Sequence, residues 1–205
     1  MNDSNITDNK PDFLSPLAAT ILRGGGGTDA YSKLTVDTGT SPRAKELLGG
    51  VTPAQLLTVP VRDVAAANAM LAGLWLWHDA LHECHEIAQD LIGPTGSFWH
   101  AIMHRREGDF SNAKYWYARC ADHRALRLIS ALALDVAGRE TMDSQLLHVV
   151  AGEFDPAAFV DLVADVVNAP ADPRRPAIVR LQQIEWEALF QHCAYEAAGE
   201  KGGMI

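Results

Sequence analysis

Cysteines and basic residues are both scarce in this sequence. The three cysteines in 205 residues, Cys84, Cys120 and Cys193, show no C-x-x-C spacing, so neither a disulfide framework nor a zinc knuckle is predicted. Lys and Arg number 17 against 26 Asp and Glu, which gives a formal charge of −9. A chain with this excess of negative charge is a poor match for nucleic-acid phosphates, so we expect no nucleic-acid partner.

Long hydrophobic runs and a targeting segment are also missing. The longest apolar run covers residues 64–77, which is shorter than the roughly 20 apolar residues that a membrane-spanning helix needs. The first residues are polar and acidic, without the basic start and continuous apolar stretch of a signal peptide. The sequence therefore predicts a cytoplasmic protein without a membrane partner.

Helix-forming residues, in contrast, are abundant. Hydrophobic residues make up 48% of the chain, Ala and Leu are frequent, and strand signals are scarce, the best being residues 34–36. Glycine and proline gather in the first 60 residues. We therefore predict an all-α fold, a compact helical bundle. An irregular N-terminal arm with short helices is expected over residues 1–60, a single all-α domain over 61–198 and a flexible tail over 199–205.

Apolar periodicity and capping residues predict one long helix followed by several shorter ones. Residues 61–91 contain one isolated glycine and no proline, so we expect a continuous helix that is capped by Asp63 and stops before Gly93 and Pro94. The other predicted helices cover residues 97–107, 111–121, 124–137, 143–150, 155–168 and 176–198.

Residues 97–121, SFWHAIMHRREGDFSNAKYWYARCA, resemble one tetratricopeptide or Sel1-type repeat. The match lies in the small, turn and aromatic positions of that repeat, here Ala101, Gly108-Asp109-Phe110, Ala113, Tyr117 and Cys120. The resemblance implies two closely packed antiparallel helices, used either as a peptide-binding groove or as one layer of a compact bundle. The words WHAIMHRRE and SNAKYW also resemble a family of bacterial proteins without an assigned activity.

Histidines cluster in the middle of the chain, on two stripes with the same spacing. The stripes are His78, His82 and His85 in the first segment and His100, His104 and Glu107 in the second, each at i, i+4, i+7. If residues 93–96 form a tight turn between antiparallel helices, His85 comes level with His104, and His82 with Glu107. We therefore expect these residues to line one pocket.

Such a pocket has the ligand types that a divalent metal ion requires. Neutral imidazole binds zinc, iron or nickel, and two histidines one helical turn apart can take adjacent coordination positions. The sequence points to His82, His85, His104 and Glu107 as metal ligands, with His78, His100 and Glu86 as further ligand-binding residues.

Two functional hypotheses remain open at this point. One is a histidine-rich pocket that holds a divalent metal or a small ligand. The other is a non-catalytic helical module that docks a protein partner or a second copy of the chain, with the histidines as structural residues hydrogen-bonded to Glu86 and Glu107. The adjacent Arg105 and Arg106 are predicted to lie on a solvated helix face, paired with Glu107 or Asp109.

Overall fold

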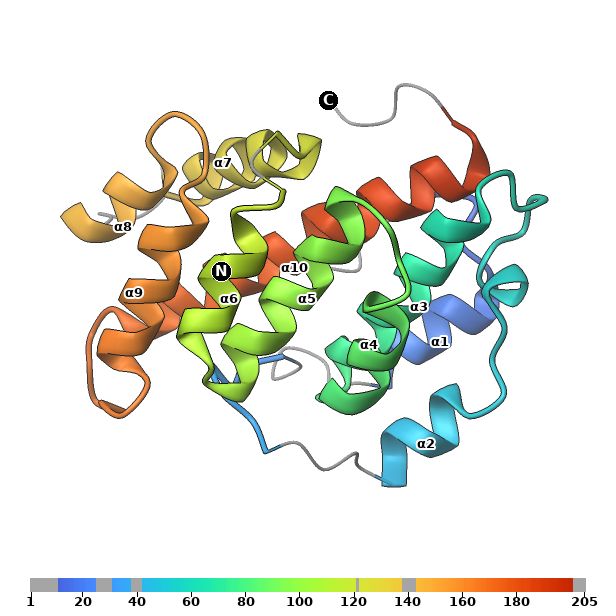
Figure 1. Cartoon of the computed structure of the whole chain (residues 1–205), viewed down its shortest axis with the longest axis horizontal. Coiled ribbons are helices and arrows are strands. Elements are labelled where there is room, and N and C mark those ends of the chain that lie inside the picture. Colours follow the sequence, from blue (N-terminus) through green and yellow to red (C-terminus); the bar gives the residue numbers. More distant parts are fainter. Residues whose placement is uncertain (1–10, 25–30, 38–41, 121, 138–142, 201–205) are drawn as a thin grey trace.

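The computed structural model describes residues 11–24, 31–37, 42–120, 122–137 and 143–200. Within these residues the chain forms α-helices, one short 3-10 helix and a single isolated bridge, so the predicted all-α fold is confirmed (Figure 1). In chain order the elements are α1 (Pro16–Arg23), α2 (Pro42–Leu48), η2 (Pro53–Leu56), α3 (Val64–Trp77), α4 (Leu81–Ala88), α5 (Pro94–Glu107), α6 (Phe110–Tyr117), α7 (Arg124–Ala137), α8 (Ser144–Val150), α9 (Pro156–Val166) and α10 (Arg175–Ala198).

Aspartate caps fix the starts of several helices where the sequence predicts them. The Asp63 side chain accepts a hydrogen bond from Ala66 N at 2.9 Å, and Asp155 accepts one from Ala158 N at 3.0 Å. Each cap satisfies a backbone N–H that has no partner inside its helix, a contribution of about 1 kcal/mol. Helix α3 therefore begins directly after its predicted cap, three residues beyond the predicted start at 61, and α9 begins one residue beyond its predicted start at 155.

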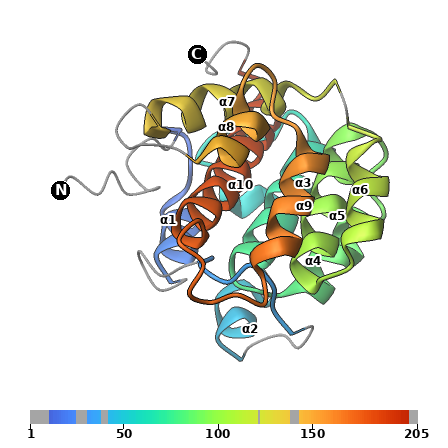
Figure 2. The same ribbon diagram turned by 90° about the vertical axis from the view of Figure 1, so that its left-hand side faces the viewer.

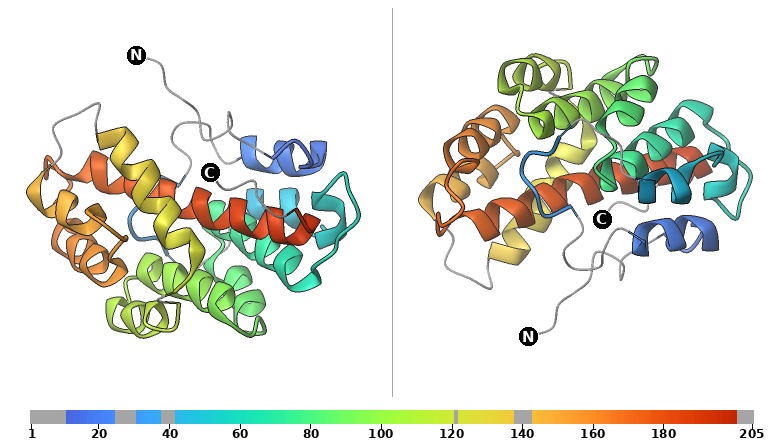
Figure 3. Two further views of the ribbon diagram at one scale, coloured as in Figure 1. Left: turned by 90° about the horizontal axis from the view of Figure 1, so that it is seen from above. Right: turned by 90° about the horizontal axis from the view of Figure 1, so that it is seen from below.

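The central element is α10, the longest helix. Both views of Figure 3 show it running through the molecule along its long axis, and it packs against α3, α7 and α9. Its buried positions are spread around its circumference and include Gln182 and Glu185 as well as apolar residues. Polar side chains on α10 therefore lie in the protein interior and need partners there.

None of the described helices combines the length and hydropathy that crossing a bilayer requires.

Helices α5 and α6 form the hairpin expected from the sequence. They lie side by side at one edge of the molecule (Figure 2) and are joined through Gly108, whose φ of +91° is the left-handed conformation that glycine adopts easily. Ala101 and Ala113 are both fully buried, and Tyr117 is 3% exposed. The hairpin itself is present, whereas its membership of the repeat family stays a prediction.

The described part of the predicted N-terminal arm belongs to the same core. Ile21, Leu34, Leu48 and Leu56 are buried in the cluster that also contains the long helices. Residues 34–36 form no strand; the segment 31–37, which we call the strap, has no helix or strand. Most of the predicted tail, residues 201–205, lies outside the described residues.

Two long side chains hold the strap against the helices. Gln182 donates to the carbonyl oxygens of Tyr31 and Lys33 at 3.1 and 3.0 Å, and Arg106 donates to the Lys33 carbonyl at 3.0 Å. The Arg106 guanidinium also lies 3.9 Å from the centre of the Tyr31 ring, and that ring stacks on Trp77. The strap is therefore fixed from α5 and α10 together.

The prediction of one continuous helix over residues 61–91 is wrong. The chain breaks between α3 and α4, where Asp79 has a φ of +61°. Arg106 donates from Nη2 to Asp79 Oδ1 at 2.7 Å and from Nη1 to the Leu76 carbonyl at 3.1 Å. These bonds come from a distant part of the chain and stabilise a backbone conformation that residues 61–91 do not favour locally, because no glycine or proline marks the break.

Candidate functional site

Three histidines converge between α4 and α5. His85 comes from α4, and His100 and His104 lie one turn apart on α5. One ligand nitrogen from each lies within 4.8 Å of the other two. The ring centres of His85 are 4.6 Å from His100 and 5.9 Å from His104. We call this group the histidine cluster.

His100 is the most enclosed member of the cluster. Its residue is 5% exposed, and its ring stacks on Trp116 of α6 at 4.1 Å between centres. The His104 ring lies parallel to it on the same helix. Burial, together with the neighbouring His85 and His104, lowers the pKa of His100 to about 4. His100 is therefore a neutral imidazole at physiological pH, the form that can coordinate a metal ion.

Neighbouring polar groups determine the tautomer of His104. Its Nδ1 lies 3.3 Å from Glu107 Oε1, and an ionised carboxylate can only accept, so the proton sits on Nδ1. The Asn112 amide nitrogen is 3.1 Å from Nε2 and 3.4 Å from Nδ1. With the proton on Nδ1, Nε2 is the acceptor of the hydrogen bond from the Asn112 amide.

The remaining residues expected in the pocket lie elsewhere. His78 ends α3 and its Nε2 lies 2.9 Å from the Ile21 carbonyl, so it is a buried structural residue. His82 and Glu86 are exposed, and Glu86 accepts from Gln89. The predicted pairing of His85 with His104 is present, but His82 does not join the cluster, because α4 directs His85 rather than His82 toward α5.

Carboxylates lie at the outer end of the cluster. Ligand atoms of His104, Glu107 and Asp109 also lie within 4.8 Å of one another. Asp109 caps α6, since its Oδ1 accepts from Asn112 N at 3.0 Å. Glu107 is therefore the better placed of the two to orient His104 or to supply a further ligand.

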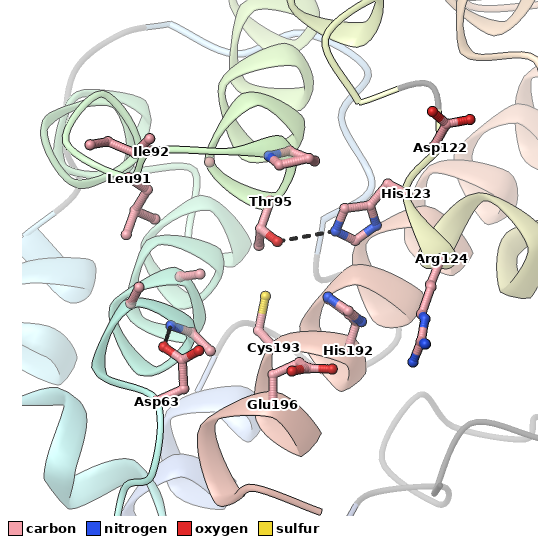
Figure 4. Close-up of a pocket in the computed structure, with 15 residues that line it drawn as sticks. Asp63, Leu91, Ile92, Thr95, Asp122, His123, Arg124, His192, Cys193 and Glu196 are labelled. Carbon is pink, nitrogen blue, oxygen red and sulfur yellow. Dashed lines mark hydrogen bonds between the residues drawn. The ribbon is translucent and has the colours of Figure 1, made fainter. Parts of the chain in front are cut away.

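The structure also contains a cavity that the sequence does not reveal. It measures about 400 Å³ and lies where α3, α5 and α7 begin, beside the last turns of α10 (Figure 4). Thr95, His123, His192 and Cys193 contribute to its lining. His123 and His192 are far apart in the sequence, and no spacing rule connects them. The only local signal is the Asp122-His123-Arg124 run at the start of α7.

Both ring nitrogens of His123 already have partners. Nδ1 accepts from Ala125 N at 3.1 Å, which makes Nε2 the protonated nitrogen, and this N–H donates to Thr95 Oγ1 at 3.1 Å. The His192 ring meets it edge-on at 4.5 Å. Burial and then His192 lower the pKa of His123 to about 3. His123 is thus a fixed, neutral residue that caps α7.

The prediction that Arg105 and Arg106 lie on a solvated face is wrong, because both are fully buried. Arg105 donates to Glu185 Oε2 and to the Tyr117 hydroxyl, each at 2.6 Å, and Tyr117 donates to Glu185 Oε1 at 2.6 Å. Helix α5 has neighbours on most sides, so even its arginines point into the interior. We call Arg105, Tyr117 and Glu185 the arginine network.

Comparison of the chain with protein-family models, with curated proteins and with solved structures found no significant match. The assignment of a function therefore rests on the geometry of the histidine cluster and the cavity.

Proposed function

We propose that the histidine cluster binds a divalent transition-metal ion, with zinc, iron and nickel as the matching ions and His85, His100 and His104 as ligands. The observation that carries this proposal is the convergence of three imidazoles from two helices, with ligand nitrogens within 4.8 Å of one another. Imidazole nitrogen is the common ligand for all three metals.

Little movement is needed to close the site around an ion. Zinc–nitrogen bonds of about 2.0–2.1 Å place tetrahedral ligands roughly 3.4 Å apart, so the nitrogens must approach by about 1.5 Å at most. His85 is the least buried of the three and can supply this movement by a small side-chain rotation. His100 and His104 are held in place by Trp116 and Glu107.

The hydrogen bond from His104 to Glu107 supports the same proposal. Histidines that ligate metals commonly donate their second ring N–H to a carboxylate, which fixes the ring orientation and increases the basicity of the ligating nitrogen. Glu107 accepts from Nδ1 of His104, and an ion bound at Nε2 would take the place of the Asn112 amide. Three neutral ligands leave the charge of the ion uncompensated and one coordination position open, as in catalytic zinc sites.

Zinc titration of the metal-free protein by calorimetry tests the proposal. We expect one ion per chain, loss of binding in His100→Ala and His104→Ala, and a loss of about 10- to 100-fold in Glu107→Gln. Binding should weaken as the pH is lowered from 7.5 to 5.5, because a protonated imidazole cannot ligate.

The matched control is His82→Ala, on the same helix as His85 but exposed and outside the cluster. It should bind zinc like the unsubstituted chain, and all variants should keep their far-ultraviolet circular dichroism. Absence of zinc, iron and nickel binding, or equal binding by the His100→Ala and His82→Ala variants, would contradict the proposal.

The alternative of a protein-interaction module has less support. The small and aromatic residues that carry the repeat resemblance, Ala101, Ala113 and Tyr117, are buried within this chain and are not available to a peptide or a second copy.

A cytoplasmic location remains part of the proposal. The three cysteines are free and buried, as is usual in a reducing compartment.

A further inference from the structure

The side chain of Asn112 brings a third helix, α6, to the histidine cluster. Its amide nitrogen lies 3.1 Å from Nε2 of His104, the nitrogen proposed to ligate the ion. Helix α5 packs against both α4 and α6, so an ion bound here meets histidines from α4 and α5 and an amide from α6. Asn112 and His85 are only partly buried, whereas His100 and His104 are buried. A ligand can therefore reach the ion from the side formed by Asn112 and His85.

The charge of the metal-bound site favours an anion in the open coordination position. The three histidines bind as neutral ligands, so a divalent ion keeps both of its positive charges. Glu107 and Asp109 offset part of this charge, but they lie at the exposed outer end of the cluster, where solvent and salt screen them. An anion bonded directly to the ion is screened much less. Its attraction to the ion therefore outweighs the repulsion from these two carboxylates.

The Asn112 amide supplies a hydrogen-bond donor for such an anion. An asparagine amide has two N–H groups, and in the metal-free chain Nε2 of His104 accepts one of them. An ion about 2.0–2.1 Å from Nε2 takes over this lone pair, so the amide needs another acceptor close by. A carboxylate has two oxygens on one carbon. One of them can bind the ion while the other accepts a charge-assisted hydrogen bond from the amide.

We propose that the open coordination position takes a small carboxylate, with one oxygen on the ion and the other hydrogen-bonded to Asn112. This inference rests on the proposed metal site and names the class of ligand that the site binds. Asn112 determines the specificity. It favours a carboxylate over a single-atom anion such as chloride, which has no second atom for the amide, while the charge of the ion disfavours a neutral compound of the same shape.

Cobalt(II), which binds the same nitrogen ligands as zinc and absorbs visible light, reports on the open position. Acetate, chloride and acetamide are titrated separately into the cobalt-loaded full-length protein at pH 7, with perchlorate keeping the ionic strength constant. We expect a saturable spectral change with acetate, weaker binding of chloride and no response to acetamide. Metal binding without a response to acetate, or equal affinities for acetate and acetamide, would overturn this inference alone, whereas absence of metal binding would overturn the proposed function with it.

Two substitutions of Asn112 distinguish a contact with the ligand from a structural role. Asn112→Ala should weaken acetate binding about three- to tenfold and leave chloride binding unchanged. It should bind zinc at least as tightly as the unsubstituted chain, because the competing hydrogen bond to His104 is gone. Asn112→Asp places a carboxylate of the chain itself beside the ion, so it should bind zinc more tightly and lose the response to acetate.

The matched control is Asn68→Ala, which removes another partly buried helical asparagine, on α3 and outside the cluster. It should bind both zinc and acetate like the unsubstituted chain. Equal effects of Asn68→Ala and Asn112→Ala on acetate binding, or a full acetate response in Asn112→Asp, would overturn the inference.

Discussion

The arginine network and the histidine cluster both include residues of α5. They differ in how many of their polar atoms have hydrogen-bond partners. In the arginine network, both terminal nitrogens of Arg105 and both oxygens of Glu185 have partners, and only Nε of Arg105 lacks one. In the histidine cluster, His85 and His100 touch other rings but make no hydrogen bond among the described residues. Polar groups paired within the chain stabilise the fold, whereas converging unpaired ligand atoms remain available to bind something else.

The largest expected effect comes from breaking the arginine network. Glu185→Gln leaves the buried Arg105 guanidinium without a counter-charge, so we expect the free energy of unfolding to fall by about 3–5 kcal/mol. His85→Ala, in the half-buried histidine cluster, should change it by less than about 1 kcal/mol. Urea unfolding at pH 7 measures both.

A double substitution separates the charge from the loss of packing. Arg105→Met combined with Glu185→Leu removes both charges and keeps similar volume, so it should recover most of the stability that Glu185→Gln loses. Equal losses in the Glu185→Gln and His85→Ala variants would contradict the distinction between the two groups.

Packing on the same helix gives a second, smaller effect. Ala101 is fully buried in the core beside α6. Ala101→Leu inserts side-chain volume that the α5–α6 hairpin cannot accommodate without displacement, and should lower the free energy of unfolding by about 1–3 kcal/mol. An unchanged denaturation midpoint would show that the close contact inferred from these small residues is absent.

His123 extends the comparison to a histidine whose nitrogens are both paired. Its pKa is lowered to about 3 in the folded chain, against about 6.5 when unfolded. Between these values the unfolded chain binds more protons, so the free energy of unfolding falls as the pH falls, by up to about 1.4 kcal/mol per pH unit. His123→Gln should make this dependence shallower in urea unfolding between pH 7 and pH 4.5.

The exposed His148 provides the control for that measurement. His148→Gln should leave the pH dependence of the free energy of unfolding as it is in the unsubstituted chain. An equally steep dependence in His123→Gln would contradict the assignment of this proton to His123.

Local signals in the sequence predict much of the fold. Asp63 and Asp155 are capping residues followed by apolar periodicity, and α3 and α9 begin beside them. The break at Asp79 has no such signal, because Arg106, which stabilises it, lies far along the chain. No local signal predicts the burial of Arg105 and Arg106 either, because the sequence does not show that α5 is surrounded by other helices.

The candidate site likewise contains some contacts that local sequence signals predict and others that they do not. His100 and His104 are one turn apart on one helix, and a short connection brings His85 to them, so helical spacing is enough to predict their meeting. His82 fails this prediction because it lies about 60° around α4 from His85, on the exposed side of that helix. His123 and His192 meet only through the packing of α7 on α10, which no local pattern encodes.

The strap at residues 31–37 determines the order in which this chain can complete its fold during synthesis. Its hydrogen bonds to Gln182 span about 150 residues (149 and 151). Closing so long a loop costs little more than closing a short one, because the entropy grows only with the logarithm of length. The contact must nevertheless wait until α10 has left the ribosome. Residues 31–37 therefore stay accessible to proteases and chaperones until α10 has been synthesised.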